Sequence, residues 1–247
     1  MHLKRSEMPP YWGLGVKERT FAVSPRGPHT KSRSIPLRVV IRDLLKAAGT
    51  GREAKQALAQ GKVLVDKKVR KDHAFGVGLM DLVEIPDLKA CYRVDVAPAG
   101  LLLKEVPQEG NKVCKVIGKT VVRGGKEQLH LHDGRNLLGG KGVAPGDSLL
   151  ISLPDQKVLA HYPFRSGAEA LIVGGKNRGA RGTILSVAGR RYMNEQATAT
   201  LRVEGREVQT LRGYIFVVGE GGKASPAVKD AEAPRRAPRR PRARKEA

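Results

Sequence analysis

Closely spaced turn signals between short apolar runs place the strongest constraint on what this sequence can fold into. From residue 86 to about 168, runs of valine, leucine and isoleucine are interrupted by turns at residues 98–100, 109–111, 124–125, 133–134 and 145–147. Apolar runs of this length between such turns are typical of strands. They predict a small all-β domain over 86–168. A similar pattern predicts a second β module over 169–219, with strands near 169–173, 182–187, 198–203 and 213–218.

Residues 37–85 carry a different pattern, in which two short amphipathic helices precede a strand at 80–85. In the first helix, apolar residues recur at the spacing that forms one face, at Leu37, Val40, Ile41, Leu44 and Leu45. The second helix begins with Thr50 three residues before Glu53, which is the spacing of a capping box. Gly61 follows it, and glycine is the residue favoured just past a helix end. The pattern predicts a small two-helix-plus-sheet domain.

The polar faces of these two helices carry an excess of positive charge. Only Asp43 and Glu53 oppose five cations, which are Arg38, Arg42, Lys46, Arg52 and Lys55. A charged helix face is usually only a solvated face, but like charges four residues apart destabilise a helix slightly. A partner rich in phosphate explains why the sequence keeps them. We therefore expect these five side chains to contact nucleic acid.

The whole chain has the charge balance of a protein that binds a polyanion. Its 247 residues include 46 Lys and Arg against 24 Asp and Glu, which gives a net charge of +22. A membrane surface is the competing polyanion, but no apolar run approaches the roughly 18 residues that a spanning helix needs. The N-terminus has no signal-peptide pattern. We therefore expect a cytoplasmic protein with a nucleic-acid partner and no membrane partner.

The two ends of the chain have little apolar content. Residues 1–36 are rich in arginine, lysine, proline, serine and glycine, which predicts an extended basic arm with Arg33 among its RNA contacts. Residues 220–247 form an arginine- and proline-rich tail, which we expect to be disordered until it meets its partner.

The turn at 174–182 is the second basic motif. Four of its nine residues are glycines, which permit positive φ and allow a backbone to approach a ligand closely. A glycine-rich turn between strands is often purely structural, since hairpins need such residues. Polar and cationic side chains at the same turn favour a clamp on a phosphate backbone, formed by Lys176, Asn177, Arg178 and Arg181.

Two motifs resemble catalytic sites without meeting their requirements. Residues 118–120 match the end of a Walker-type phosphate loop, but Val113 stands where that loop needs a glycine. Cys114 has no base partner in the sequence and is not expected to be a nucleophile. Cys91 and Cys114 lack the spacing of a zinc site, so we expect reduced structural thiols.

A metal site is the third alternative. His130 and His132 share one face of a predicted strand near Asp133, which is ligand-like spacing. Zinc sites normally recruit three or four protein ligands, and no further cluster of histidine or cysteine supports this one. We expect no metal, no cofactor and no catalytic residue. Aromatic residues make up only 4% of the chain, so binding should depend on RNA backbone and shape more than on base stacking.

Several of these motifs occur in the order of one known family. Residues 37–85 resemble the RNA-binding domain named after bacterial ribosomal protein S4, and residues 173–184 resemble a KOW motif, the nucleic-acid-binding turn of an SH3-like barrel. With the sequences at 27–29 and 128–136, the arrangement is similar to the archaeal and eukaryotic small-subunit ribosomal protein S4e family. This resemblance covers about residues 1–219. Lys67 departs from it, because the family usually has glycine there.

The resemblance implies a structural component of the small ribosomal subunit that binds rRNA and neighbouring ribosomal proteins. It implies no small-molecule substrate. The expected fold is α+β and multidomain, with the arm at 1–36, the S4-type domain at 37–85, the central β domain at 86–168, an SH3-like KOW barrel at 169–219 and the tail at 220–247.

Two other functions stay open at the level of sequence. S4-type domains also accompany pseudouridine synthases, so an RNA-modifying enzyme is one alternative, and it would need a catalytic aspartate in a recognisable catalytic domain. A transcription or translation factor that uses the KOW barrel is the other. Such a factor would need an apolar surface for protein binding and would be found free of ribosomes.

Overall fold

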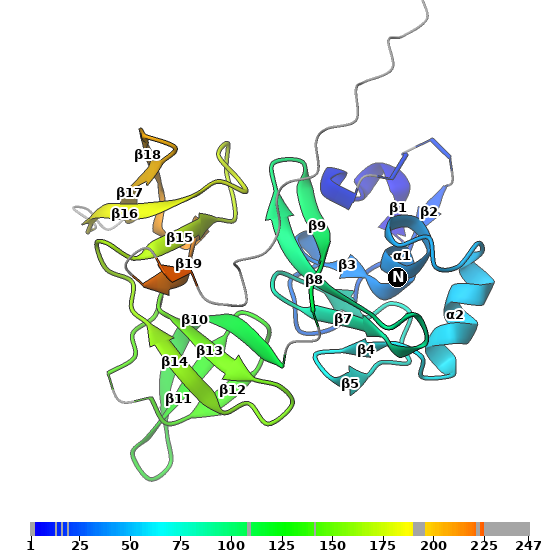
Figure 1. Cartoon of the computed structure of the whole chain (residues 1–247), viewed down its shortest axis with the longest axis horizontal. Coiled ribbons are helices and arrows are strands. Elements are labelled where there is room, and N and C mark those ends of the chain that lie inside the picture. Colours follow the sequence, from blue (N-terminus) through cyan, green and yellow to red (C-terminus); the bar gives the residue numbers. More distant parts are fainter. Residues whose placement is uncertain are drawn as a thin grey trace, which may run out of the picture.

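A computed structural model describes residues 3–12, 14–15, 17–18, 20–107, 110–140, 142–189, 196–220 and 223–224. The described chain is mostly β, with three larger sheets and two short two-stranded ones. Figure 1 shows two lobes: residues 3–107, here called the first lobe, lie on one side, and residues 110–220, the second lobe, on the other. Among the described residues, no helix has both the length and the apolar character needed to cross a membrane.

Both predicted helices are present in the first lobe. Helix α1 (Leu37–Val39) continues as a wider π-helical segment (Val40–Leu44), in which the Leu45 N–H donates to the carbonyl of Val40 at 2.9 Å. Lys46 has a φ of 53° and lies past the helix end. Lys46 therefore does not continue the cationic helix face on which Arg38 and Arg42 were expected.

Helix α2 (Gly51–Ala59) confirms the predicted capping box. The Glu53 N–H donates to the Thr50 hydroxyl at 3.2 Å, and the Thr50 N–H donates to the Glu53 carboxylate at 3.3 Å. Ala54 and Leu58 are fully buried, and Gly61 has a φ of 78°. The sequence thus sets both ends of this helix locally.

The main sheet of the first lobe has the strand order β5-β4-β7-β8-β9. Its strands are β4 (Leu64–Val65), β5 (Lys68–Val69), β7 (Leu82–Ile85), β8 (Ala90–Ala97) and β9 (Gly100–Glu105). All neighbouring strands pair antiparallel. Strands β8 and β9 were expected in the central domain, but β7 and β8 are joined by only a short turn and pair directly. The expected boundary after residue 85 therefore falls inside one sheet.

The described part of the N-terminal arm packs against this lobe instead of extending away from it. It holds β1 (Leu3–Lys4), which pairs with β2 (Phe21–Ala22), and β3 (Ile35–Pro36), which pairs with β6 (Gly76–Val77). Short 3-10 turns cover Arg5–Glu7, Pro10–Trp12 and Lys31–Arg33. Met8, Trp12 and Ile35 join the core formed by α1, α2 and the sheet. The expectation that residues 1–36 have little core was wrong for these residues, because one tryptophan and a few apolar side chains suffice to dock them.

The second lobe begins with a five-stranded sheet in the order β12-β11-β10-β13-β14. Its strands are β10 (Asn111–Val122), β11 (Lys126–Leu131), β12 (Asn136–Leu138), β13 (Ser148–Ser152) and β14 (Val158–Tyr162). The turns between β10 and β11 and between β11 and β12 lie at the predicted glycines, but the turn between β13 and β14, at residues 153–157, was not predicted. Cys91 and Cys114 are both buried and form no disulfide, in agreement with the predicted structural thiols.

The last sheet has the order β18-β17-β16-β15-β19-β20. Its strands are β15 (Glu169–Ile172), β16 (Arg181–Ala188), β17 (Thr198–Val203), β18 (Arg206–Leu211), β19 (Ile215–Glu220) and β20 (Lys223–Ala224). The four predicted strands are present, but β18 was missed because most of its residues are polar and none is buried. Its outer strands do not pair with each other in the described residues, so the sheet is open. Of the tail predicted at 220–247, Glu220 ends β19 and Lys223–Ala224 form β20, so disorder was the wrong prediction for these three residues; residues 221–222 and 225–247 lie outside the described residues.

Candidate RNA-binding site

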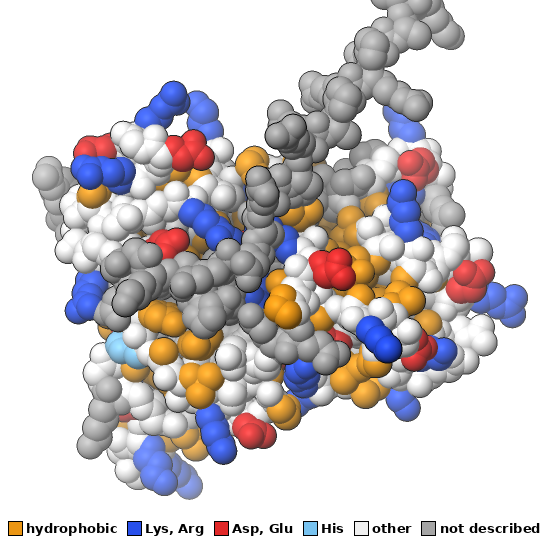
Figure 2. Space-filling model, viewed as in Figure 1, with side chains coloured by type: hydrophobic (Ala, Val, Ile, Leu, Met, Phe, Trp, Pro, Cys, Tyr) orange, Lys and Arg blue, Asp and Glu red, His pale blue; other side chains and the backbone are white. Residues whose placement is uncertain are grey.

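The ten predicted RNA-binding residues fall into two groups in the structure. One group lies on the S4-type helices and the loop between them, and the other lies on the arm and on the turn at 174–182. Figure 2 shows lysine and arginine side chains spread over both lobes on the viewed face rather than gathered in one patch. The two groups therefore need separate descriptions.

The helix group offers three exposed cations, Lys46, Arg52 and Lys55. Arg42 instead donates two hydrogen bonds to the neighbouring Asp43, at 2.9 and 2.7 Å. That pairing leaves Arg42 less available for a phosphate than its spacing suggested.

A further cation joins this group from the arm. Burial lowers the pKa of His73, and the positive charges of Lys55, Arg38 and Arg26 lower it further. The guanidinium of Arg38 lies directly against Gly51 at the start of α2. The sequence analysis did not include Arg26 among the cations of this group, because Arg26 is far in sequence from Lys55 and His73.

In the turn at 174–182, some side chains are exposed to solvent and others contact the rest of the protein. Lys176 and Asn177 are exposed. Arg181 donates to Asp95 on β8 at 2.9 Å, and Asp95 also binds Lys104 at 2.6 Å. The cation of Arg181 therefore links the last sheet to the first lobe.

The glycines of the same turn are used in packing. Gly179 has a φ of +85°, and its α-carbon lies so close to the backbone of Ala97 and Pro98 that a Cβ would meet it at 2.9 Å. Gly182 lies directly against the carbonyl of Arg202 on the paired strand β17. Of the two roles expected of these glycines, positive φ is present at Gly179, and protein backbone lies in the space beside both of them.

Arg33 and Arg178 come together although they are far apart in the sequence. Both residues line one cavity together with Tyr11. Burial raises the pKa of the Tyr11 phenol, and both guanidinium groups act in the opposite direction. The Tyr11 hydroxyl itself donates to the carbonyl of Ser34 at 3.3 Å. The arm and the last sheet thus meet at one point on the surface.

Beneath this surface lies a buried ion-pair cluster, here called the Lys112 cluster. The Lys112 ammonium is fully buried and lies 2.7 Å from Asp66, 2.6 Å from Asp81 and 3.0 Å from Asp133. Two further cationic groups complete the cluster: Arg135, which binds Asp66 at 2.6 Å and Asp133 at 3.2 Å, and His29, which binds Asp81 at 2.8 Å. With His29 protonated, three positive charges balance three carboxylates.

Coulombic interactions outweigh the cost of burial at Asp81 and Lys112, whereas burial and the neighbouring Asp81 raise the pKa of Asp66. Burial opposes ionisation of Asp81, but Lys112 and His29 hold the pKa of that carboxyl well below its usual range. Burial likewise opposes the charged form of Lys112, yet Asp81 and Asp66 raise its pKa well above the ordinary value. The cluster joins the arm, the S4-type domain and β10 of the second lobe, so it fixes the two lobes relative to each other.

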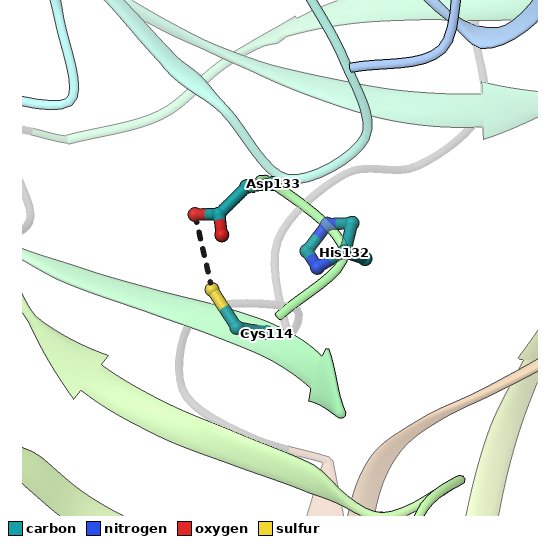
Figure 3. Close-up of side chains that lie close together, drawn as sticks. All are labelled: Cys114, His132 and Asp133. Carbon is teal, nitrogen blue, oxygen red and sulfur yellow. Dashed lines mark hydrogen bonds between the residues drawn. The ribbon is translucent and has the colours of Figure 1, made fainter. Parts of the chain in front are cut away.

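Cys114, His132 and Asp133 lie close enough to one another to suggest a metal site (Figure 3). Their ligand atoms already have other partners. His132 Nδ1 accepts from the Lys115 N–H at 3.2 Å, and His132 Nε2 is 3.1 Å from the carbonyl of Leu79. Asp133 is bound by the Lys112 cluster, and burial raises the pKa of the Cys114 thiol well above its ordinary value. These atoms fit a packed junction better than a metal centre.

His130, which the sequence placed on the same strand face as His132, has its own hydrogen-bond partners in the structure. His130 Nε2 lies 2.9 Å from the Thr120 hydroxyl, and its Nδ1 lies 2.8 Å from Asn136. A β-bulge in the pairing of β10 with β11 lies beside these residues. The two imidazoles therefore have separate surroundings.

Comparison with known proteins identifies the family. The model of ribosomal family S4e matches residues 81–158, and the S4 domain matches residues 39–83. The chain is 42% identical over 231 residues to small ribosomal subunit protein eS4 of Methanocaldococcus jannaschii, covering 89% of this chain and 94% of that protein. The chain belongs to the ribosomal protein S4e family. The eS4 protein of Archaeoglobus fulgidus is 40% identical over 232 residues, covering 92% of this chain and 97% of the relative.

A solved structure of the S4e family extends the likeness to three dimensions. The crystal structure of 30S ribosomal protein S4e from Thermoplasma acidophilum superposes with a TM-score of 0.67 and 31% identity. It covers 78% of this chain and 98% of that chain. The resemblance inferred from sequence motifs is therefore confirmed.

Proposed function

We propose that this S4e-family protein is a structural constituent of the small ribosomal subunit that binds folded rRNA in the cytoplasm. The observation that carries this proposal is the identity of about 40% to curated eS4 proteins over 89% of the chain. Those relatives are named as ribosomal proteins and not as enzymes. The charge of +22 supports the same function, because binding by Lys and Arg releases counterions from RNA.

The last sheet serves in this proposal as the KOW module of an SH3-like fold. Its turn presents the exposed Lys176 and Asn177 beyond the packed Gly179, so the tip is available to a phosphate backbone. The helix group provides the second contact through Arg52, Lys55 and Lys46. Two contacts on lobes that are joined by buried ion pairs suit recognition of RNA shape.

Co-sedimentation tests the proposed function directly. In a sucrose gradient of cell extract, we expect the native protein to travel with the small ribosomal subunit, and not at the top of the gradient. Washing at high salt should release it progressively, because phosphate contacts are screened. A protein found mainly in free fractions would instead support the free transcription or translation factor. A catalytic effect on rRNA nucleotides in purified material would support the modifying enzyme.

The helix group can be tested by charge removal at its exposed members. Replacing both Arg52 and Lys55 by glutamine should weaken rRNA binding and lower the salt slope by about one unit for each lost phosphate contact. Both side chains are exposed, so the thermal midpoint should hardly change. Filter binding over a salt series measures both quantities.

A matched control separates a specific contact from a general loss of charge. The variant that replaces Lys126 and Lys157 by glutamine removes the same charge from two exposed positions of the second lobe. We expect it to weaken binding less. Equal losses in the two double variants would mean that the helices present merely a solvated face.

A further inference from the structure

A cavity of about 950 Å³ lies where the arm, the first lobe and both sheets of the second lobe meet. Much of its lining is apolar, including Leu79, Val96, Leu101, Val173, Val187 and Phe216. The rings of Tyr11 and His132 are also among the lining residues, and His132 lies edge-on to Phe216 with ring centroids 5.3 Å apart. The volume is at the upper end of the range of small-molecule sites.

Four cationic side chains line this cavity, and no carboxylate does so among the described lining residues. The cations are Arg33, Lys115, Arg178 and Arg212. They come from the arm, from β10, from the turn at 174–182 and from the segment before β19. This arrangement contrasts with the Lys112 cluster, where the charges balance.

Lys115 is partly buried, whereas Arg33 and Arg212 are exposed. Its ammonium donates to the carbonyls of Ile215 at 2.5 Å and Gly213 at 3.2 Å, and both of these partners are neutral. Burial lowers the pKa of Lys115 to about 8, and the nearby Arg33 and Arg212 act in the same direction. An anion in the cavity would relieve this repulsion.

Arg178 and Arg212 can also interact with an anion. The buried Nε of Arg178 has no hydrogen-bond partner among the described residues. Arg212 donates to the carbonyl of Pro145 at 2.8 Å and lies over the ring of Phe164, so its described contacts are with a neutral carbonyl and a ring. Cations that lack carboxylates in a partly desolvated site attract negative charge strongly.

We propose that this cavity binds one unpaired nucleotide of the rRNA, with its base against the apolar wall and its phosphate beside Lys115 and Arg33. The inference rests on the proposed function and adds a specific subsite to it. Proteins recognise single-stranded RNA by taking splayed bases into such pockets, where aromatic and apolar side chains contact the base. The chain's own tail at 225–247 is a poorer occupant, since its sequence carries eight Lys and Arg against three acidic residues and the cavity is itself cationic.

Photocrosslinking of the full-length protein bound to small-subunit rRNA tests the subsite. Ultraviolet irradiation should link a nucleotide to a peptide that contains Tyr11, Val173 or Phe216. Replacing Arg33 and Lys115 by glutamine should reduce that crosslink and lower rRNA affinity about tenfold. The single variant Arg33→Gln should give a smaller loss in the same direction, and because Arg33 is exposed, this variant keeps the test valid if the double variant folds poorly.

The control removes two exposed cations outside the cavity, by replacing Arg202 and Arg206 with glutamine. It should leave the crosslink unchanged. Bound rRNA whose crosslinks all fall on other peptides would overturn the subsite while leaving the proposed function intact. Failure of the protein to bind rRNA at all would instead remove the proposed function.

The remaining outcomes identify other occupants and would each overturn the proposal. Protection of the cavity peptides by adenosine 5′-monophosphate in the absence of rRNA would point to a free nucleotide as the occupant of the cavity. A cavity crosslink that appears only after removal of residues 225–247 would point to the tail. A crosslink from these peptides to a neighbouring ribosomal protein would point to a protein partner.

The pH dependence of rRNA binding gives an independent readout. The wild-type protein should lose affinity as the pH rises from 7 to 9.5, because the free Lys115 loses its proton near pH 8. The Lys115→Gln variant should lose less over this interval. The other charged or titratable lining residues, Tyr11, His29, Arg33, His132, Arg178 and Arg212, are present in both proteins. Equal losses in the two proteins would contradict a phosphate at Lys115.

Discussion

The Lys112→Met variant is expected to lose about 3–5 kcal/mol of unfolding free energy, the cost of breaking a buried ion pair by removing one partner. Methionine fills similar space but leaves Asp66, Asp81 and Asp133 buried without the cation that they share. Arg135 and His29 compensate only in part. Urea denaturation followed by circular dichroism measures the shift in midpoint.

A surface lysine provides the matched control. Lys119 binds Glu127 at 2.8 Å, but both side chains are more than a quarter exposed. Lys119→Met should therefore cost less than about 1 kcal/mol. Similar losses of unfolding free energy in the two variants would mean that the burial of Lys112 does not increase the cost of removing its charge.

The pH dependence of the Lys112→Met defect follows from the same charges. In the wild type, Asp81 and Asp133 have lowered pKa values, so their stabilisation is present above the ordinary value of 3.8 and is lost as the pH falls through the folded values. In the variant, burial is no longer opposed by Lys112, and the carboxyl groups should bind protons at higher pH. The difference in stability between the two proteins should therefore be largest near pH 7 and shrink toward pH 4.

Local sequence signals predicted the elements of this fold better than their assembly. The capping box at Thr50 and the glycine turns depend on residues that are neighbours in sequence, so both could be recognised there. The pairing of β8 with β7 depends on register across a hairpin, and the expected domain boundary missed it. Strand β18 has no alternation of apolar and polar residues, so the sequence pattern did not reveal it. Its pairing with β17 through backbone hydrogen bonds does not need such an alternation.

The candidate site was predictable in its charge but not in its geometry. The sequence identified Arg33 and Arg178 as cations, but only the fold brings them beside Tyr11. Lys112 lies in an apolar strand pattern, and its three partners come from residues 66, 81 and 133. Nothing in the sequence distinguishes such a lysine from a solvated one, since the distinction depends on what packs against it.

These ion pairs also bear on how the protein positions its RNA contacts. The Lys112 cluster and the pair between Arg181 and Asp95 both join the first lobe to the second. Exposed cations on separate rigid bodies recognise RNA shape only if the bodies keep a fixed relative position. The buried ion pairs therefore support recognition of RNA shape without contacting the RNA, because they hold the two lobes in a fixed relative position.

Trp12→Ala is expected to release the N-terminal arm from the first lobe. Trp12 is only 1% exposed, and its indole N–H donates to the carbonyl of Ser34 at 3.1 Å. Truncation leaves a large cavity beside Met8 and Ile35 and removes the shorter of the two hydrogen bonds to that carbonyl, which keeps the Tyr11 hydroxyl as a donor, for a loss of about 3–5 kcal/mol. Arm residues that are packed in the free wild-type protein should then open locally.

Limited trypsin digestion of the free protein measures this release. In the wild type, cleavage at Arg26 should be slow, because its backbone N–H donates to the carbonyl of Ala74 and its carbonyl accepts from Gly76. In the Trp12→Ala variant the same bond should be cut much faster, while cleavage within the second lobe keeps its rate. Trp12→Phe retains an aromatic ring and should fall between the two. Rapid cleavage at Arg26 in the wild type would contradict a docked arm and would restore the extended arm that the sequence predicted.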